Sequence, residues 1–374
     1  MIIIYVFSFG LYIYGIYQNI LSCYHFYSNT YKISNYFITL QQYLQYTLAK
    51  MNQFDLKSYR PRSKGYKQFF KNIQKFKIQL ENFANKVNRI HGKIVSFKKL
   101  AQIGYVMKQF FVLYDDEELE KAFLFSFGFH GYLDTLAGLK QNIAKKSITS
   151  MKFYSSKIPI VKFEQLYYPA LMFENPVKND INMKKNIIIT GPNAAGKTTV
   201  IKSTLLNILF SQQIGFSFCK KGGITPFDYI HAYINIPDTI ARDSLFQAEA
   251  RRCKTIIDII KNNPNKKHFC IFDELYSGTN PYEAISSASS YLKYLNQFEN
   301  VKYILTTHFI KICKLLNNNV QNFNMKTTIV NKEPHYTYKL IPGTSDIKGG
   351  VCVLKELKYP KKMLRWTSKI MRTL

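Results

Sequence analysis

The stretch from Ile187 to Thr199, IIITGPNAAGKTT, has the residue types and spacing of a phosphate-binding loop. It fits the pattern G-x-x-x-x-G-K-[ST], in which an apolar run leads into a loop bounded by glycines and the loop leads into a helix. The glycines let the backbone approach phosphate oxygens, and the N–H groups at the start of the helix face the anion. In this pattern Lys197 reaches the β- and γ-phosphates and the Thr198 hydroxyl ligates Mg²⁺. The stretch therefore predicts a Mg²⁺–nucleotide site.

Two carboxylates directly follow a second apolar run, Phe269-Cys270-Ile271-Phe272. Such a run is typical of a buried parallel strand, which delivers the residues after it to the carboxyl edge of its sheet. We expect Asp273 to hold the Mg²⁺ shell and Glu274 to polarise the attacking water as a general base. An acidic strand end is a weak signal by itself, but downstream of a phosphate-binding pattern it becomes a strong one.

A third apolar run, Val301–Leu305, ends in Thr306-Thr307-His308. A histidine after such a strand would lie at the same sheet edge as the two carboxylates. His308 could hydrogen-bond the γ-phosphate or orient the attacking water, and a purely structural role also stays open.

The elements that must position these residues alternate between strands and helices. We expect extended runs at Ile158–Phe163, Ile187–Thr190 and near Tyr229–Ile234, and helices from Thr198 to about Gln212 and from about Leu245 to Lys261. This alternation predicts an α/β domain built on a parallel sheet.

The upstream part of the chain has a different pattern. Apolar residues recur with the 3.6-residue period of an amphipathic helix, at Phe69, Phe70, Ile73, Phe76, Leu80, Phe83 and Val87. Between Lys50 and Lys108 cations are frequent and the acids are Asp55 and Glu81. One helix face is therefore basic and could contact the phosphates of DNA, or could simply be solvated.

Residues 1–31 contain no Asp, Glu, Lys or Arg, and Met1–Tyr17 is the most apolar part. This run is at the short limit for a membrane span, which needs about 20 apolar residues. The alternatives are a membrane anchor and a buried helix of an all-α domain. The absence of a basic n-region and of a small-residue cleavage site disfavours a cleaved signal peptide.

The formal net charge is +29, which favours a polyanionic partner such as nucleic acid or an anionic membrane surface. An AT-rich genome, which enriches Lys, Asn, Ile and Tyr, would give the same composition without selection for binding. The six cysteines are scattered and form no C-x-x-C pair, so neither a disulfide framework nor a zinc site is indicated. That pattern suits a reducing compartment.

Several segments, in order, resemble the ATPase domain of the MutS family of DNA mismatch-repair proteins, a branch of the ABC-type ATPases. Thr190–Thr199 resembles the family's TGPNMGGKST, Phe272–Asn280 its DEIGRGTS, and Thr306–Phe309 its ATHY. Arg242–Glu249 stands where the family has GRSTFMVEM, and Pro176–Ile181 resembles a VPNDI-type strand beside the nucleotide.

The resemblance implies further site residues. Ser244 would reach the γ-phosphate bound by a partner subunit, Asn179 would lie beside the nucleotide, and Tyr338 would face the adenine. The family has an aromatic residue where this chain has Pro176. The whole loop would contact the nucleotide, through Gly191, Pro192, Asn193, Ala194, Ala195, Gly196, Lys197, Thr198 and Thr199.

The resemblance also implies a domain organisation. An α/β P-loop NTPase domain of ABC type would occupy residues 151–352, preceded by an all-α lever- or core-like domain over residues 29–150. Residues 1–28 would form the apolar N-terminal segment and residues 353–374 a short helical tail. This length leaves no room for the family's mismatch-reading and connector domains.

The implied activity is Mg²⁺-dependent ATP hydrolysis by a homodimer, or by a heterodimer with another MutS-like chain. ATP would close the dimer and hydrolysis would open it, and the helical half would transmit this change to DNA. The implied role is mismatch repair or related DNA maintenance inside the cell, in the nucleus, the cytoplasm or a viral factory. Another ABC-type DNA-repair ATPase and a membrane-tethered, nucleotide-dependent scaffold are the alternatives.

Overall fold

The computed structural model describes residues 2–54, 64–90, 100–234, 245–330, 333–345, 354–355 and 357–373. The chain forms two compact units, Met1–Lys140 and Gln141–Leu374. The domain bounds expected from the sequence stay a prediction. Ser244, with Arg242 and Asp243 before it, lies outside the described residues, as does Cys352.

The first unit is helical. Its helices are α1 (Ile2–Asn52), α2 (Lys64–Val87), α3 (Leu100–Asp115) and α4 (Glu117–Ala144). The buried residues of α2 include Phe70, Ile73, Leu80, Phe83 and Val87, which follow the period read from the sequence. They pack into one core with residues of α1, α3 and α4, among them Phe37, Leu44, Val106 and Phe129.

Polar contacts fix α4 within this unit. Asp116 caps the start of α4, because its Oδ1 accepts hydrogen bonds from the N–H groups of Glu118 and Leu119 at 3.1 and 3.0 Å. Farther along α4, the Ser126 hydroxyl lies 2.6 Å from the hydroxyl of Tyr43 on α1. The helices are therefore held by directional contacts as well as by apolar packing.

The amino-terminal part of α1 is exposed within the unit. The helix runs without a break through residue 28, and its large apolar side chains from Ile3 to Tyr27 lie mostly in solvent, with Ile3 84% exposed. Among the described residues, α1 is the one helix long and apolar enough to cross a membrane, and none of its most apolar window is buried.

The second unit is built on a six-stranded sheet in the order β12-β11-β5-β10-β9-β8. The strands are β5 (Asn186–Thr190), β8 (Tyr229–Tyr233), β9 (His268–Asp273), β10 (Val301–Thr307), β11 (Val320–Val330) and β12 (Glu333–Pro342). All neighbours pair in parallel except β11 and β12, which are antiparallel. The mixed α/β character predicted from the sequence is therefore present.

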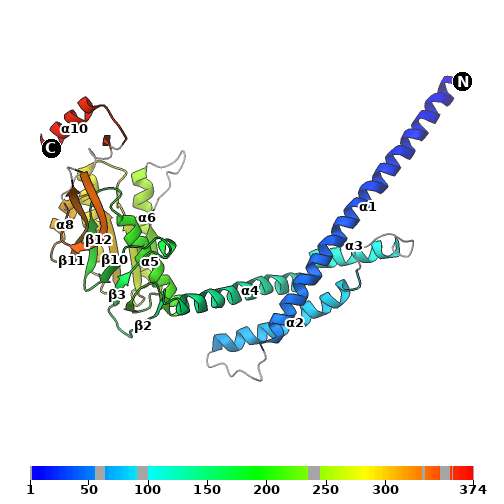
Figure 1. Ribbon diagram of the computed structural model, residues 1–374, viewed down its shortest axis with the longest axis horizontal. Coiled ribbons are helices and arrows are strands. Elements are labelled where there is room, and N and C mark those ends of the chain that lie inside the picture. Colours follow the sequence, from blue (N-terminus) through cyan, green and yellow to red (C-terminus); the bar gives the residue numbers. More distant parts are fainter. Residues whose placement is uncertain are drawn as a thin grey trace. The chain divides into compact units, whose positions relative to one another are not determined.

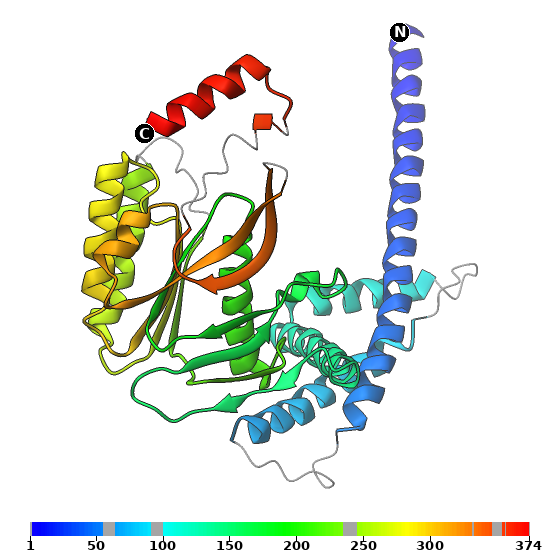
Figure 2. The same ribbon diagram turned by 60° about the vertical axis from the view of Figure 1, so that its left-hand side comes forward.

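Helices cover both faces of this sheet (Figures 1 and 2). Helix α5 (Lys197–Ile214) packs on one face, and α6 (Leu245–Asn262), α7 (Pro281–Leu295) and α8 (Ile310–Leu315) pack on the other. Successive strand residues point alternately into the two cores. Ile187 and Ile189 of β5 join the α5 core, and Ile188 joins the opposite one. Burial on both faces explains why these strands are continuous apolar runs.

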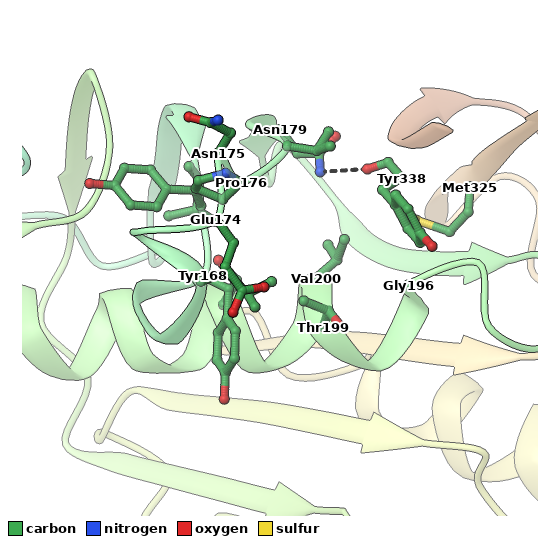
Figure 3. A pocket seen from close by; sticks show the side chains of 15 residues that line it. Tyr168, Glu174, Asn175, Pro176, Asn179, Gly196, Thr199, Val200, Met325 and Tyr338 are labelled. Carbon is green, nitrogen blue, oxygen red and sulfur yellow. Dashed lines mark hydrogen bonds between the residues drawn. The ribbon is translucent and has the colours of Figure 1, made fainter. Parts of the chain in front are cut away.

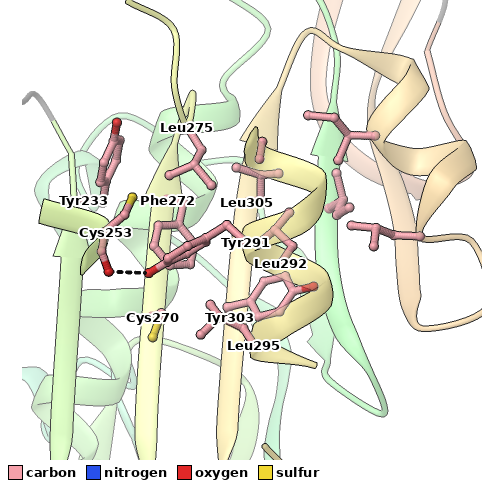
Figure 4. Packing of buried hydrophobic residues seen from close by; sticks show 14 of the residues in the cluster. Tyr233, Cys253, Cys270, Phe272, Leu275, Tyr291, Leu292, Leu295, Tyr303 and Leu305 are labelled. Atoms are coloured by element: carbon pink, nitrogen blue, oxygen red, sulfur yellow. Dashed lines mark hydrogen bonds between the residues drawn. The ribbon is translucent and has the colours of Figure 1, made fainter. Parts of the chain in front are cut away.

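Figure 4 shows the core beneath α6 and α7. Tyr291 of α7 packs edge-on against Phe272 of β9, and its hydroxyl donates a hydrogen bond to the Cys253 carbonyl of α6 at 3.3 Å. Cys253 and Cys270 are buried here as free thiols.

The remaining elements of the second unit are a smaller sheet and several short segments. A four-stranded sheet in the order β2-β7-β3-β4 contributes to the α5 core. Its strands are β2 (Lys152–Phe153), β3 (Val161–Leu166), β4 (Asn179–Asn182) and β7 (Lys221–Ile224). The other elements are β1 (Thr149–Ser150), β6 (Phe216–Ser217), the 3₁₀ turn η2 (Pro169–Leu171) and α10 (Lys361–Thr373).

A pair of histidines lies toward the amino-terminal ends of β8 and β9. His231 Nε2 is 3.1 Å from His268 Nδ1, and the two rings stack. Burial, together with the charges of His268 and Arg252, lowers the pKa of His231 to about 4. Both rings are therefore neutral at physiological pH.

The pKa of His231 is lowered in the folded chain, so the unfolded chain takes up a proton at this residue first as the pH falls. The stability that neutral His231 contributes is therefore present above pH 6.5 and is lost as the pH falls toward 4. We expect the free energy of unfolding to fall by about 3 kcal/mol over this window through His231. His231→Asn should flatten the pH dependence of urea unfolding, whereas His335→Asn, at an exposed histidine, should not. An identical pH dependence in all three proteins would contradict this prediction.

Candidate functional site

The segment Gly191–Thr199, called the loop below, runs from the end of β5 into the first turn of α5. Its backbone conformation requires its glycines. Gly191 and Gly196 have φ angles of 150° and 93°. A Cβ added at Gly196 would lie 3.1 Å from Tyr338 Cδ1, and one at Gly191 would lie 3.3 Å from Met325 Cβ. Gly196, the residue at the N-cap of α5, has no side chain to cap the helix, which leaves its first N–H groups to a ligand.

Lys197 lies inside this loop and is 5% exposed. Its Nζ donates hydrogen bonds to the carbonyls of Gly191 and Pro192 at 3.0 and 3.1 Å and lies 3.3 Å from His308 Nε2. Burial lowers the pKa of the Lys197 ammonium, and the nearby charges of Glu274 and Asp273 oppose that shift. The ammonium is thus placed where the glycine loop, the acids and the histidine meet.

Asp273 joins three segments. Its Oδ2 accepts a hydrogen bond from the Thr198 hydroxyl at 2.9 Å, and its Oδ1 accepts one from the Thr306 hydroxyl. A carboxylate and a hydroxyl are hard oxygen donors, which Mg²⁺ uses together with phosphate and water oxygens. The Thr198 and Asp273 side chains therefore fit a magnesium site. Among the described residues no group of three or more His, Cys, Asp and Glu side chains forms a denser metal cluster.

Glu274 and His308 are in hydrogen-bond contact, with 2.8 Å between Glu274 Oε1 and His308 Nε2. The hydrogen bond from His308 is the main cause that lowers the pKa of Glu274, with further lowering by the charges of His308 and Lys197. Glu274 has a φ of 54°, and its N–H donates to the Thr306 carbonyl at 3.1 Å. The carboxylate is therefore ionised and oriented at neutral pH.

An apolar cavity of about 330 Å³ lies beside the loop (Figure 3). Its lining includes Tyr168, Pro176, Val200, Met325 and Tyr338. The resemblance named Tyr338 as facing the adenine, a role that stays a prediction. Tyr168, Val200 and Met325 belong to no motif, and sequence reasoning missed them. Thr199 also lines the cavity, next to Gly196.

Asn179 also lines this cavity, but both ends of its amide contact β12. Its Nδ2 donates to the Tyr338 carbonyl at 3.0 Å, and its Oδ1 accepts from the Leu340 N–H at 2.8 Å. Tyr338 itself has a φ of 55°. Asn179 thus holds Tyr338 over Gly196. In the rest of the loop, Asn193 and Ala194 are exposed, and Pro192 and Ala195 are buried.

The family model of MutS domain V matches residues 187–374, half of the chain. The chain belongs to the MutS family. The matched part of this MutS-family chain begins in β5 and includes the Gly191–Thr199 loop, Asp273, Glu274 and His308, whereas Asn179 lies upstream of it.

Relatives named DNA mismatch repair protein MutS agree with this assignment. The protein of Pelotomaculum thermopropionicum is 28% identical over 213 residues, which are 56% of this chain and 24% of the relative. Those of Parabacteroides distasonis and Persephonella marina are each 29% identical, over 58% and 60% of this chain and 25% and 26% of the relative. The chain thus spans about a quarter of the length of these MutS proteins.

Proposed function

We propose that this MutS-family chain binds and hydrolyses ATP with Mg²⁺ and acts in DNA mismatch repair or related DNA maintenance inside the cell. One observation carries the proposal. Three segments of the α/β unit bring together Lys197, Thr198, Asp273, Glu274 and His308 beside one glycine-bounded loop. The Thr198 hydroxyl contacts Asp273, and His308 contacts both Glu274 and Lys197.

The charges of the site support a nucleotide with a divalent cation. Lys197 supplies one cation, whereas Asp273 and Glu274 supply two carboxylates, so a triphosphate would meet net negative charge there. Mg²⁺, held by Thr198 and Asp273, would neutralise that repulsion. The adjacent apolar cavity is suited to a flat heterocycle, with the Tyr338 ring at one side.

Hydrolysis assigns a role to each residue at the sheet edge. Glu274 would accept a proton from the attacking water, whose oxygen bonds to the γ-phosphorus as the bond to the β,γ-bridging oxygen breaks, giving ADP and phosphate. Lys197 would balance the charge on the β- and γ-phosphate oxygens. His308 contacts both Glu274 and Lys197, so it could orient the water or hydrogen-bond the γ-phosphate.

We further propose that two such ATPase domains pair, as a homodimer or with another MutS-like chain. Ser244 of each would complete the partner's site, and closure with ATP would be reversed by hydrolysis. Family membership and the position of Ser244 directly before α6 support this assignment. A helix start behind Ser244 would favour the negative charge of a γ-phosphate.

Glu274→Gln should keep ATP binding and lower turnover by about 100-fold or more, because it removes the general base and leaves the loop intact. Turnover is measured as phosphate release and binding with a fluorescent ATP analogue. Lys197→Ala is the comparison variant and should lose nucleotide binding as well. Unchanged turnover in Glu274→Gln would reject the general-base role.

A row of cations that could contact DNA lies on α2. Its members Lys64, Lys67 and Lys71 are exposed along one face of the helix. Lys75 continues the same face but pairs with Glu118 at 3.0 Å. We propose that the first three contact DNA phosphates. Such contacts release counterions, so they make affinity depend on salt.

Lys67→Gln combined with Lys71→Gln should therefore reduce the slope of log affinity against log salt by about 2, measured with duplex DNA. The charge-matched control combines Lys311→Gln with Lys314→Gln, which are exposed on α8. A flat salt dependence in the unmodified chain, or equal slopes in both double variants, would reject the α2 surface.

A further inference from the structure

Glu249 is a buried acid that the proposed reaction does not use. It lies on α6 and is 2% exposed. Its Oε1 accepts hydrogen bonds from the Ser277 N–H at 3.1 Å and the Ser277 hydroxyl at 3.2 Å, and its Oε2 accepts one from the Gly278 N–H at 3.1 Å. None of the ion pairs between described residues includes it. A carboxylate is costly to bury unless several donors compensate, and here all three donors come from one loop.

That loop begins with the proposed general base. In Glu274–Gly278, two residues other than glycine have left-handed backbones, Glu274 with a φ of 54° and Tyr276 with a φ of 58°. Such conformations cost on the order of 1 kcal/mol or more each and persist where surrounding contacts enforce them. The Glu274 N–H is held by the Thr306 carbonyl at one end of the loop. Glu249 holds the other end.

Apolar contacts hold the same loop against the first turn of α6. A Cβ added at Gly278 would lie 2.6 Å from Leu245 Cγ, so only glycine allows this approach. The Phe246 and Tyr276 rings lie 5.6 Å apart between centroids. The loop therefore has little freedom to relax if the contact with Glu249 changes, except by moving Tyr276 and Glu274 out of their present backbone conformations.

We propose that Glu249 is a positioning residue for hydrolysis, which fixes the carboxylate of Glu274 by anchoring the loop that follows it. This inference rests on the proposed ATPase function. Among the described residues, Glu249 hydrogen-bonds to Ser277 and Gly278 and not to the Gly191–Thr199 loop or Asp273, so its loss should slow the chemical step and leave nucleotide affinity in place. Loss of a group that supports only the stability of the domain would not lower the rate of the chemical step while leaving nucleotide affinity unchanged.

Two variants disturb the contact from opposite sides. Glu249→Gln keeps the shape but turns an N–H donor toward a backbone N–H, and Gly278→Ala pushes the loop away from Leu245. Both should lower kcat by about tenfold or more, as expected for a misplaced catalytic group, with the Kd for an ATP analogue changed less than about threefold. Asp258→Ala, on a half-exposed residue of the same helix, should leave kcat and Kd unchanged.

The rates are measured per nucleotide-binding site, titrated in each preparation, so that misfolded protein does not imitate a loss of kcat. Unchanged kcat in both variants, or losses of kcat and affinity in parallel, would overturn the positioning role. If the wild-type chain hydrolyses ATP and both variants do so at the same rate, this inference is overturned and the proposed ATPase activity stands. A wild-type chain that binds ATP without hydrolysing it would overturn the proposed activity and this inference together.

Discussion

The parallel pairing of β5, β10 and β9 is the constraint on which the candidate site depends. Thr190 pairs with Thr307 and Asp273 with Thr306, so three strands end at one level of the sheet. Segments that are far apart in the sequence then meet within hydrogen-bond distance. A shift of one residue in the pairing of β9 with β10 would turn Asp273 or the Thr306 hydroxyl to the opposite face of the sheet and separate them.

Charged and titratable side chains meet at this edge of the sheet. Lys197 is buried beside two acids, and His308 lies between Lys197 and Glu274. The hydrogen bond from His308 keeps Glu274 ionised, which suits a base and disfavours an approaching anion. An ionised Glu274 and a bound anion are compatible when a divalent cation accompanies the anion. The backbone strain at Glu274 and its anchoring through Glu249 place geometric demands on the same carboxylate.

Much of this could be predicted from the sequence because the pattern is local. The glycine-bounded loop and the acidic strand end need only neighbouring residues to be recognised, and the expected helices and strands of the α/β unit lie close to those observed. The period of α2 was equally readable, because burial on one face repeats every 3.6 residues.

Other features depend on contacts between distant segments, which no local pattern reports. The amide of Asn179 contacts β12 at Tyr338 and Leu340, 159 and 161 residues away. Glu249 ends the segment that stands where the family has GRSTFMVEM, but that segment does not reveal its partners Ser277 and Gly278. The lining of the cavity by Tyr168 and Met325 likewise follows from tertiary packing. The roles of Ser244, Asn179 and Tyr338 toward a nucleotide stay predictions.

The central claim is that the loop and the strand-end acid form one Mg²⁺–nucleotide site. The most direct test is the affinity for an ATP analogue with and without Mg²⁺, in the wild-type chain and in Asp273→Asn. Mg²⁺ should tighten binding by the wild-type chain, and Asp273→Asn should lose this gain while binding without Mg²⁺ is retained. An absence of nucleotide binding, or an equal effect of Mg²⁺ in both proteins, would contradict the central claim.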